Sequence, residues 1–152
     1  IDIAPYVNMV HGIDISSKMI EKANLNAKDK SKNLTFSHNN IYNEKLLAES
    51  YDTILAFNIL HIIDDQGKAL LRINELLSKG GIIVSSTPCL RSKKTIETLF
   101  INMLSKLRII PSISFFKYKE LEELFTNANF QLVEKVKDFE GKYSYLIVAK
   151  KL

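Results

Sequence analysis

Cysteine is nearly missing from this chain of 152 residues, which contains only Cys89. No disulfide can therefore form within the chain, and zinc clusters built on several cysteines are excluded. The absence of disulfides is typical of a reducing compartment, so the sequence predicts a cytoplasmic protein.

Long apolar runs are missing as well. Charged or amide residues interrupt every stretch before about 18 apolar residues accumulate, which argues against a membrane-spanning helix. Hydrophobic residues make up 46% of the chain and charged residues 25%, the proportions of an ordinary globular domain. A chain of this length can bury a hydrophobic core without disulfides or metal ions to stabilise it, so we expect a single domain over residues 1–152.

The basic side chains include little arginine. Lys and Arg number 21 against 17 Asp and Glu, a formal net charge of +4, but only Arg72, Arg91 and Arg108 are arginine. Recognition of phosphates and bases relies heavily on the forked guanidinium, whereas scattered lysines are typical of a solvated surface. Nucleic acid is therefore not the expected partner.

Short apolar runs alternate with helical patterns in the first part of the chain. The predicted strands cover residues 10–15, 34–37, 51–57 and 81–85. The third of these is apolar at nearly every position, which favours a strand covered on both faces. Strands that alternate with helices predict crossover units on a parallel sheet.

Helical periodicity follows two of these strands. Ser16 or Ser17 can cap the first helix, and Asp64 or Asp65 can cap the second. Gly80 is placed to end the second helix at the C′ position.

The last third of the chain predicts two helices and two further strands. The helices cover residues 96–107 and 118–128, and the strands cover 130–136 and 143–149. Asn129 can end the second helix because asparagine tolerates the left-handed conformation. The link over 140–142 is too short for a crossover helix, so the final strands must be antiparallel. We therefore expect a doubly wound, mostly parallel α/β sheet with a C-terminal antiparallel hairpin strand, in three α/β/α layers.

Ligands of open α/β sheets bind beyond the carboxyl ends of the strands. Asp14 follows the first predicted strand, where a carboxylate can accept hydrogen bonds from both hydroxyls of a ribose. The alternative is that Asp14 only helps to cap the helix that begins near Ser16.

Three segments carry a combination of motifs that resembles one family. Residues 10–23, VHGIDISSKMIEKA, contain an acidic strand end and the helix that follows it. Residues 51–61, YDTILAFNILH, end a strand on L-H, and residues 76–84, LLSKGGIIV, approach the next strand through a glycine pair. With the reversed strand near the C-terminus, they resemble the class I S-adenosylmethionine-dependent methyltransferases, in particular small bacterial methyltransferase-domain enzymes. The resemblance covers nearly the whole chain and implies a Rossmann-like fold.

By this resemblance, five residues between positions 14 and 41 would contact S-adenosylmethionine. Asp14 would hold the ribose hydroxyls, and Ile15 and Met19 would pack on the adenine or the sugar. Asn40 and Ile41 stand where the family usually has an aspartate followed by a small residue against the adenine. An amide oxygen accepts from the adenine amino group without charge, so this contact is expected to be weaker. The alternative is that the asparagines form a simple turn.

Phe57 and Asn58 would line the cofactor near its methionine part. His61 is the candidate catalytic base, because imidazole titrates near neutrality. A structural histidine bonded to backbone is the alternative, since His61 lies in the apolar run 59–63. Methyl transfer from an activated sulfonium can also proceed by alignment alone, without a base.

The segment over 105–117 is rich in isoleucine and phenylalanine. In this family such an insertion often helps to form the acceptor pocket, which would make it a lid over an apolar substrate. Core packing or a homodimer face is the plainer interpretation, and contact with a membrane surface is a third.

The resemblance also implies a first strand and a glycine-rich turn, which are expected before Ile1 and have no substitute elsewhere in the chain. Residues 1–10 would then be the end of the helix that follows that turn. A chain that truly began at Ile1 would lack the central strand of the sheet.

The sequence thus predicts an S-adenosylmethionine-dependent methyltransferase that acts on a small molecule, without a metal site. One alternative is a degenerate, non-catalytic module with the same fold, and another is a methyltransferase directed at RNA. A nicotinamide-dependent oxidoreductase would also use an acid after its second strand, but the short link over 140–142 argues against it.

Overall fold

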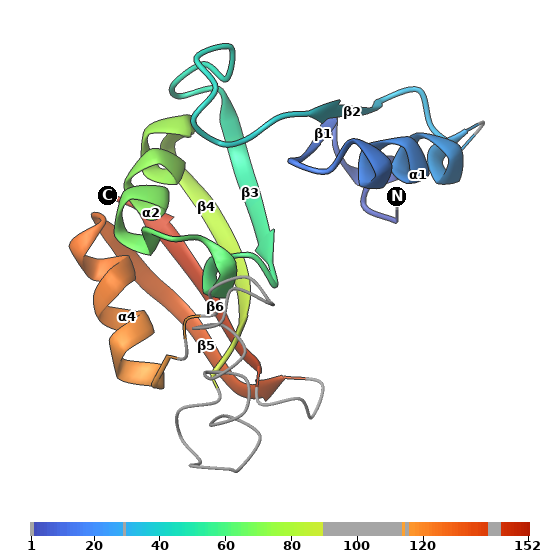
Figure 1. The fold of residues 1–152 in the computed structure, drawn as a ribbon. Coiled ribbons are helices and arrows are strands. Elements are labelled where there is room, and N and C mark those ends of the chain that lie inside the picture. The colour runs from blue at the N-terminus through green and yellow to red at the C-terminus, as the bar shows by residue number, and fades with distance from the viewer. Residues whose placement is uncertain (1, 29, 90–113, 115, 140–143) are drawn as a thin grey trace, which may run out of the picture. The chain divides into compact units, whose positions relative to one another are not determined.

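The computed structural model describes residues 2–28, 30–89, 114, 116–139 and 144–152 (Figure 1). The chain divides into two compact units, residues 1–46 and residues 47–152, and each is described by itself. Strands and helices alternate in both units, which confirms the α/β class. In the described part of the chain, no helix is both long and apolar enough to cross a membrane.

The first unit contains two parallel strands and one helix. Its elements are the 3-10 turn η1 (Ala4–Tyr6), β1 (Val10–Asp14), α1 (Ser17–Ala27) and β2 (Leu34–His38). The Oγ atom of Ser16 accepts the Met19 N–H at 3.4 Å, so Ser16 is the cap of α1. Residues 1–10 do not hold the end of an α-helix as expected. Before β1, the described residues 2–9 contain the turn η1 in place of an α-helix, and this turn includes Pro5, a residue that has no N–H to donate.

The second unit is built on a sheet of four strands. Its elements are β3 (Tyr51–Phe57), the 3-10 turn η2 (Leu60–Ile62), α2 (Gln66–Leu76), β4 (Leu77–Pro88), α4 (Tyr118–Asn127), β5 (Phe130–Phe139) and β6 (Ser144–Lys151). The strand order is β3-β4-β6-β5, with β3 and β4 parallel and the other two pairs antiparallel. The antiparallel final pair is therefore confirmed. The helix predicted over 96–107 lies outside the described residues.

Helices α2 and α4 pack on the same face of this sheet (Figure 1). Alternate residues of β4 and β6 point toward them because successive side chains of a strand lie on opposite faces. Fully buried side chains from α2, α4, β4 and β6 meet on this face, among them Leu70, Ile83, Leu121, Phe125, Tyr145 and Ile147. Asn129 follows α4 with φ of 60°, as its tolerance of the left-handed region predicts.

Within the described residues of the second unit, only one face of β3 is covered, whereas the sequence predicts that both are. Ala56 is buried against the helices, whereas Leu55 and Phe57 on the other face are 44% and 53% exposed. The apolar run suggested full burial, but β3 ends the row of four strands and both α2 and α4 lie on one face.

Gly80 does not end α2. The helix stops at Leu76, Leu77 is already extended, and Gly80 lies within β4 at φ of 71°. Tyr51 pairs with Leu77 and Thr53 with Ile82, so residues 78–81 of β4 stand opposite one residue of β3. Such a bulge needs a left-handed position, which glycine adopts without a steric penalty.

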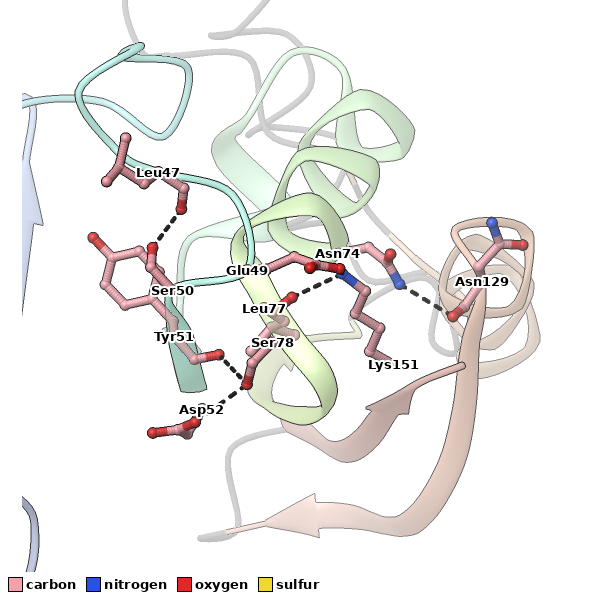
Figure 2. A network of polar contacts seen from close by, with 10 residues as sticks. All are labelled: Leu47, Glu49, Ser50, Tyr51, Asp52, Asn74, Leu77, Ser78, Asn129 and Lys151. Atoms are coloured by element: carbon pink, nitrogen blue, oxygen red, sulfur yellow. Dashed lines mark hydrogen bonds and ion pairs between the residues drawn. The ribbon is translucent and has the colours of Figure 1, made fainter.

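A polar network closes the carboxyl end of α2 (Figure 2). The N–H groups of Glu49 and Ser50 donate to the carbonyls of Glu75 and Leu76 at 2.9 and 3.0 Å. The Nζ atom of Lys151 donates to the carbonyl of Leu77 at 2.8 Å and lies 3.6 Å from a Glu49 carboxylate oxygen. The last carbonyls of a helix have no partners within it, so these donors supply what the helix cannot.

We expect Lys151→Met to destabilise the protein by about 1–3 kcal/mol, because the carbonyl of the buried Leu77 loses a charged donor. Lys150→Met is the matched control, since Lys150 is exposed on the same strand. Urea unfolding of both variants measures the difference, and equal loss in the two would contradict the role given to Lys151.

Candidate functional site

The carboxyl ends of β1 and β2 lie side by side in the first unit. Asp14 pairs with His38 at the end of the parallel register, and the Asn39 N–H donates to the Asp14 carbonyl at 2.9 Å. The structure therefore brings Asp14 together with the residues that follow β2. The predicted ligand contacts of the first unit, from Asp14 to Ile41, lie on or near this edge.

The Asp14 carboxylate is oriented by the chain that follows it. Its Oδ1 atom accepts the Ser16 N–H at 2.8 Å, a contact that tightens the turn into α1. Within the described residues no other partner of this carboxylate is recorded. One oxygen is thus anchored, which leaves the second oxygen to accept from a ligand.

Two apolar side chains flank this carboxylate in sequence and stand in solvent. Ile15 is 75% exposed and Met19 is 53% exposed. Exposed apolar side chains beside a partly free carboxylate suit a ligand that is apolar on one side and carries hydroxyls on the other.

Asn40 has a local role in the turn after β2. Its Oδ1 atom accepts the Tyr42 N–H at 2.8 Å, and its own N–H donates to Asn39 Oδ1 at 3.0 Å. The bond to Tyr42 is that of an Asx turn, so the turn interpretation describes the geometry. Ile41 follows, partly buried. A carbonyl oxygen has two lone pairs, so Asn40 keeps one acceptor position.

In the second unit, the corresponding edge lies at the ends of β3 and β4. Phe57 ends β3, and the Asn58 N–H donates to the Ser86 carbonyl of β4 at 2.8 Å. Asn58 has φ of 54°, a left-handed conformation that few residues other than glycine and asparagine adopt at low cost. Left-handed positions held by residues other than glycine occur often at ligand sites.

His61 lies in η2, directly after this edge. Its carbonyl accepts the Ser114 N–H at 2.7 Å, and its Nδ1 atom is enclosed without a hydrogen-bond partner among the described residues. Burial of the ring lowers the pKa of His61, because the charged form loses solvation. The backbone-bonded ring expected of a structural histidine is therefore not observed.

A second contact near His61 was not predicted. Gln66 Nε2 donates to Ser114 Oγ at 2.8 Å and to the Ile63 carbonyl at 2.5 Å. These bonds fasten Ser114 to the turn that carries His61. No local pattern could have indicated the bond to Ser114, because Gln66 and Ser114 are 48 positions apart.

Cys89 follows the carboxyl end of β4. Its thiol is not suited to nucleophilic chemistry. It is 1% exposed, and burial together with the nearby Glu120 charge raises the pKa of its thiol to about 12. The thiolate, which is the reactive form, is thus scarce near neutral pH.

In residues 2–28, 30–89, 114, 116–139 and 144–152, no group of three or more His, Cys, Asp or Glu side chains is arranged to hold a metal ion. Two shallow grooves of the described surface are not lined by the predicted contact residues themselves: one is lined by α1 residues and His38, the other by Gln66, Ser114 and residues of α4.

Comparison with known proteins assigns the chain to a family. The sequence model of the methyltransferase domain matches residues 1–143, and the chain belongs to this family. No curated protein matches the sequence.

Solved structures agree on the fold. An S-adenosylmethionine-dependent methyltransferase from Methanosarcina mazei superposes with a TM-score of 0.76 at 18% identity, covering 99% of this chain and 85% of that one. The PH0226 protein from Pyrococcus horikoshii gives 0.74 at 18% identity, covering 97% and 74%. A chain of the complex that contains the Trm112 methyltransferase activator of Haloferax volcanii gives 0.73 at 14%, covering 94% and 72%. The chain thus has the Rossmann-like α/β fold of these proteins.

The lowered pKa of His61 predicts a pH dependence of stability. Because the folded pKa lies below the unfolded value of 6.5, the unfolded chain binds the proton first as the pH falls. The free energy of unfolding should therefore decline from about pH 7.5 toward pH 5.5.

His61→Phe should flatten this decline, because the variant has no ring to protonate. His38→Gln, which removes an exposed histidine, should leave it in place. Urea unfolding across the pH range provides the measurement, and a slope unchanged by His61→Phe would count against the assignment.

Proposed function

We propose that this chain binds S-adenosylmethionine and transfers its methyl group to a small molecule in the cytoplasm. The observation that carries the proposal is the Asp14 carboxylate at the carboxyl end of β1, anchored through Oδ1 by Ser16 and with a second oxygen available. Membership in the methyltransferase domain family supports the reaction class.

The residues of the first unit fit the nucleoside part of this cofactor. Asp14 would accept hydrogen bonds from the ribose hydroxyls, and the exposed Ile15 and Met19 would cover the adenine or sugar. Asn40 would offer its remaining acceptor position to the adenine amino group, with Ile41 beside the ring.

The residues of the second unit fit the amino acid part. Phe57 is half exposed at the end of β3, and Asn58 is held in a strained conformation by its bond to Ser86. A residue fixed in this way is already ordered before a ligand arrives, which lowers the entropy lost on binding.

When bound, S-adenosylmethionine supplies a methyl group on a sulfonium that is already activated. The remaining task of the protein is to hold the acceptor in line and to exclude water, which can provide much of the acceleration. His61 matches this task, because burial of its ring disfavours the uptake of a proton.

A small-molecule acceptor is favoured over RNA by the state of the arginines. Arg72 is the described one, and it lies 2.9 Å from the Glu75 carboxylate in an ion pair. An arginine that is already paired is a poor start for a phosphate-binding patch. Binding of RNA that falls steeply with salt would favour the alternative.

The test is calorimetric titration of the full-length protein with S-adenosylhomocysteine. Asp14→Asn keeps an oxygen that can accept the Ser16 N–H but removes the charge, so it separates the ligand role from the turn role. We expect Asp14→Asn and Asp14→Ala to weaken binding by about 1.5–3 kcal/mol, with little loss of melting temperature in Asp14→Asn.

Glu21→Gln is the matched control, because it removes an exposed carboxylate of α1 beyond the proposed contacts. Unchanged affinity in Asp14→Asn would remove Asp14 from the site. Absence of binding in the unmodified protein would favour a module that kept the fold and lost the cofactor.

A further inference from the structure

We infer that His61 is a neutral imidazole with its proton on Nε2, so that it presents a hydrogen-bond donor, and not a base, beyond the carboxyl end of β3. The inference deepens the proposed function, since it specifies what the acceptor must offer. It concerns the one residue that the sequence nominated as a catalytic base.

The two ring nitrogens of His61 have different surroundings. Nδ1 is enclosed by protein atoms and has no hydrogen-bond partner in the described part of the chain. Nε2 is not enclosed in this way, and no hydrogen bond from it to a described residue is recorded. Only Nε2 can therefore reach water or a ligand.

This difference selects one tautomer. A neutral imidazole has one N–H and one lone pair, on opposite nitrogens. A proton on Nδ1 would bury a donor with no acceptor, and orphaned buried N–H groups are rarer than orphaned acceptors. A proton on Nε2 leaves only a lone pair inside and lets the N–H bond to solvent or substrate.

The turn that carries the ring is held in place. Leu60 is fully buried, and the His61 carbonyl accepts the Ser114 N–H at 2.7 Å. Ser114 is itself bonded through Oγ to Gln66. The backbone on both sides of the ring is thus fixed, and the enclosed position of Nδ1 belongs to the fold.

The neutral state follows from the same enclosure. Burial lowers the pKa of His61, so the doubly protonated ring is disfavoured near neutral pH. A protonated ring would also place a second N–H in the enclosed position of Nδ1.

The consequence concerns the class of acceptor. An Nε2–H binds an atom with a lone pair, such as a carbonyl or carboxylate oxygen, and cannot take a proton from an O–H or N–H. We therefore assign to this site small molecules that carry such an oxygen near the methylated atom and whose attacking atom does not rely on His61 for deprotonation.

The test is NMR correlation of imidazole ring protons with both ring nitrogens, in protein labelled with nitrogen-15 histidine at about pH 7.5. The chain has three histidines, so the spectra are simple to assign. His38 serves as an internal reference: its Nε2 lies 2.8 Å from the Ile15 carbonyl, which can only accept, so its proton is on Nε2.

We expect His61 to show a protonated Nε2, as His38 does, together with an unprotonated Nδ1. Loss of one set of signals in His61→Gln assigns the residue. If that variant does not fold, His11→Gln and His38→Gln assign His61 by elimination.

A protonated Nδ1 with an unprotonated Nε2, or a doubly protonated ring at this pH, would overturn the inference. The measurement needs neither cofactor nor acceptor. Its failure is therefore distinct from the failure of the proposed function, which is decided by the titration with S-adenosylhomocysteine.

Discussion

The second unit depends on the backbone pairing of β4, which bonds to β3 on one side and β6 on the other. Because β4 pairs with both neighbours, the parallel pair β3–β4 and the antiparallel pair β4–β6 belong to one sheet. Helices α2 and α4 cover one continuous face of that sheet. On that face Ser85 and Thr87 are fully buried, and their hydroxyls lie 3.1 Å apart. Short side chains here let the helices approach the sheet, and mutual hydrogen bonding offsets the cost of burying two hydroxyls.

Much of the fold could be predicted because its causes are local. The cap at Asp65, the left-handed Asn129 and the antiparallel final strands each follow from a few neighbouring residues. The exposure of Leu55 could not be predicted, because it depends on which face of the sheet α2 and α4 cover. The place of Gly80 inside β4 depends likewise on pairing with β3.

In the candidate site, too, some features have local causes and others depend on segments that are distant in sequence. The positions of Asp14 and Asn40 at strand ends could be predicted from the sequence, and so could the chance that each serves a turn. The enclosure of His61 Nδ1 and the bond from Ser114 could not, since they arise from segments that are distant along the chain. Sequence reasoning found the histidine, but its chemistry depends on contacts that only the folded unit provides.

Burial restrains three of the described groups that could react. The thiol of Cys89 has a raised pKa, the ring of His61 a lowered one, and burial and the bond to Glu122 raise the pKa of Tyr145. Suppression of these three groups is compatible with the proposed methyl transfer, in which the leaving group is already activated. In that proposal the protein contributes positioning rather than proton transfer.

The bulge at residues 78–81 has a consequence for how the family can vary. The register of β3 and β4 is set by Tyr51 with Leu77 on one side and by Thr53 with Ile82 on the other. Four residues of one strand already face a single residue of its neighbour, so a change of length there leaves both flanking pairs intact. Insertions and deletions between homologues should therefore accumulate at this point, inside a strand, where a sheet normally permits none.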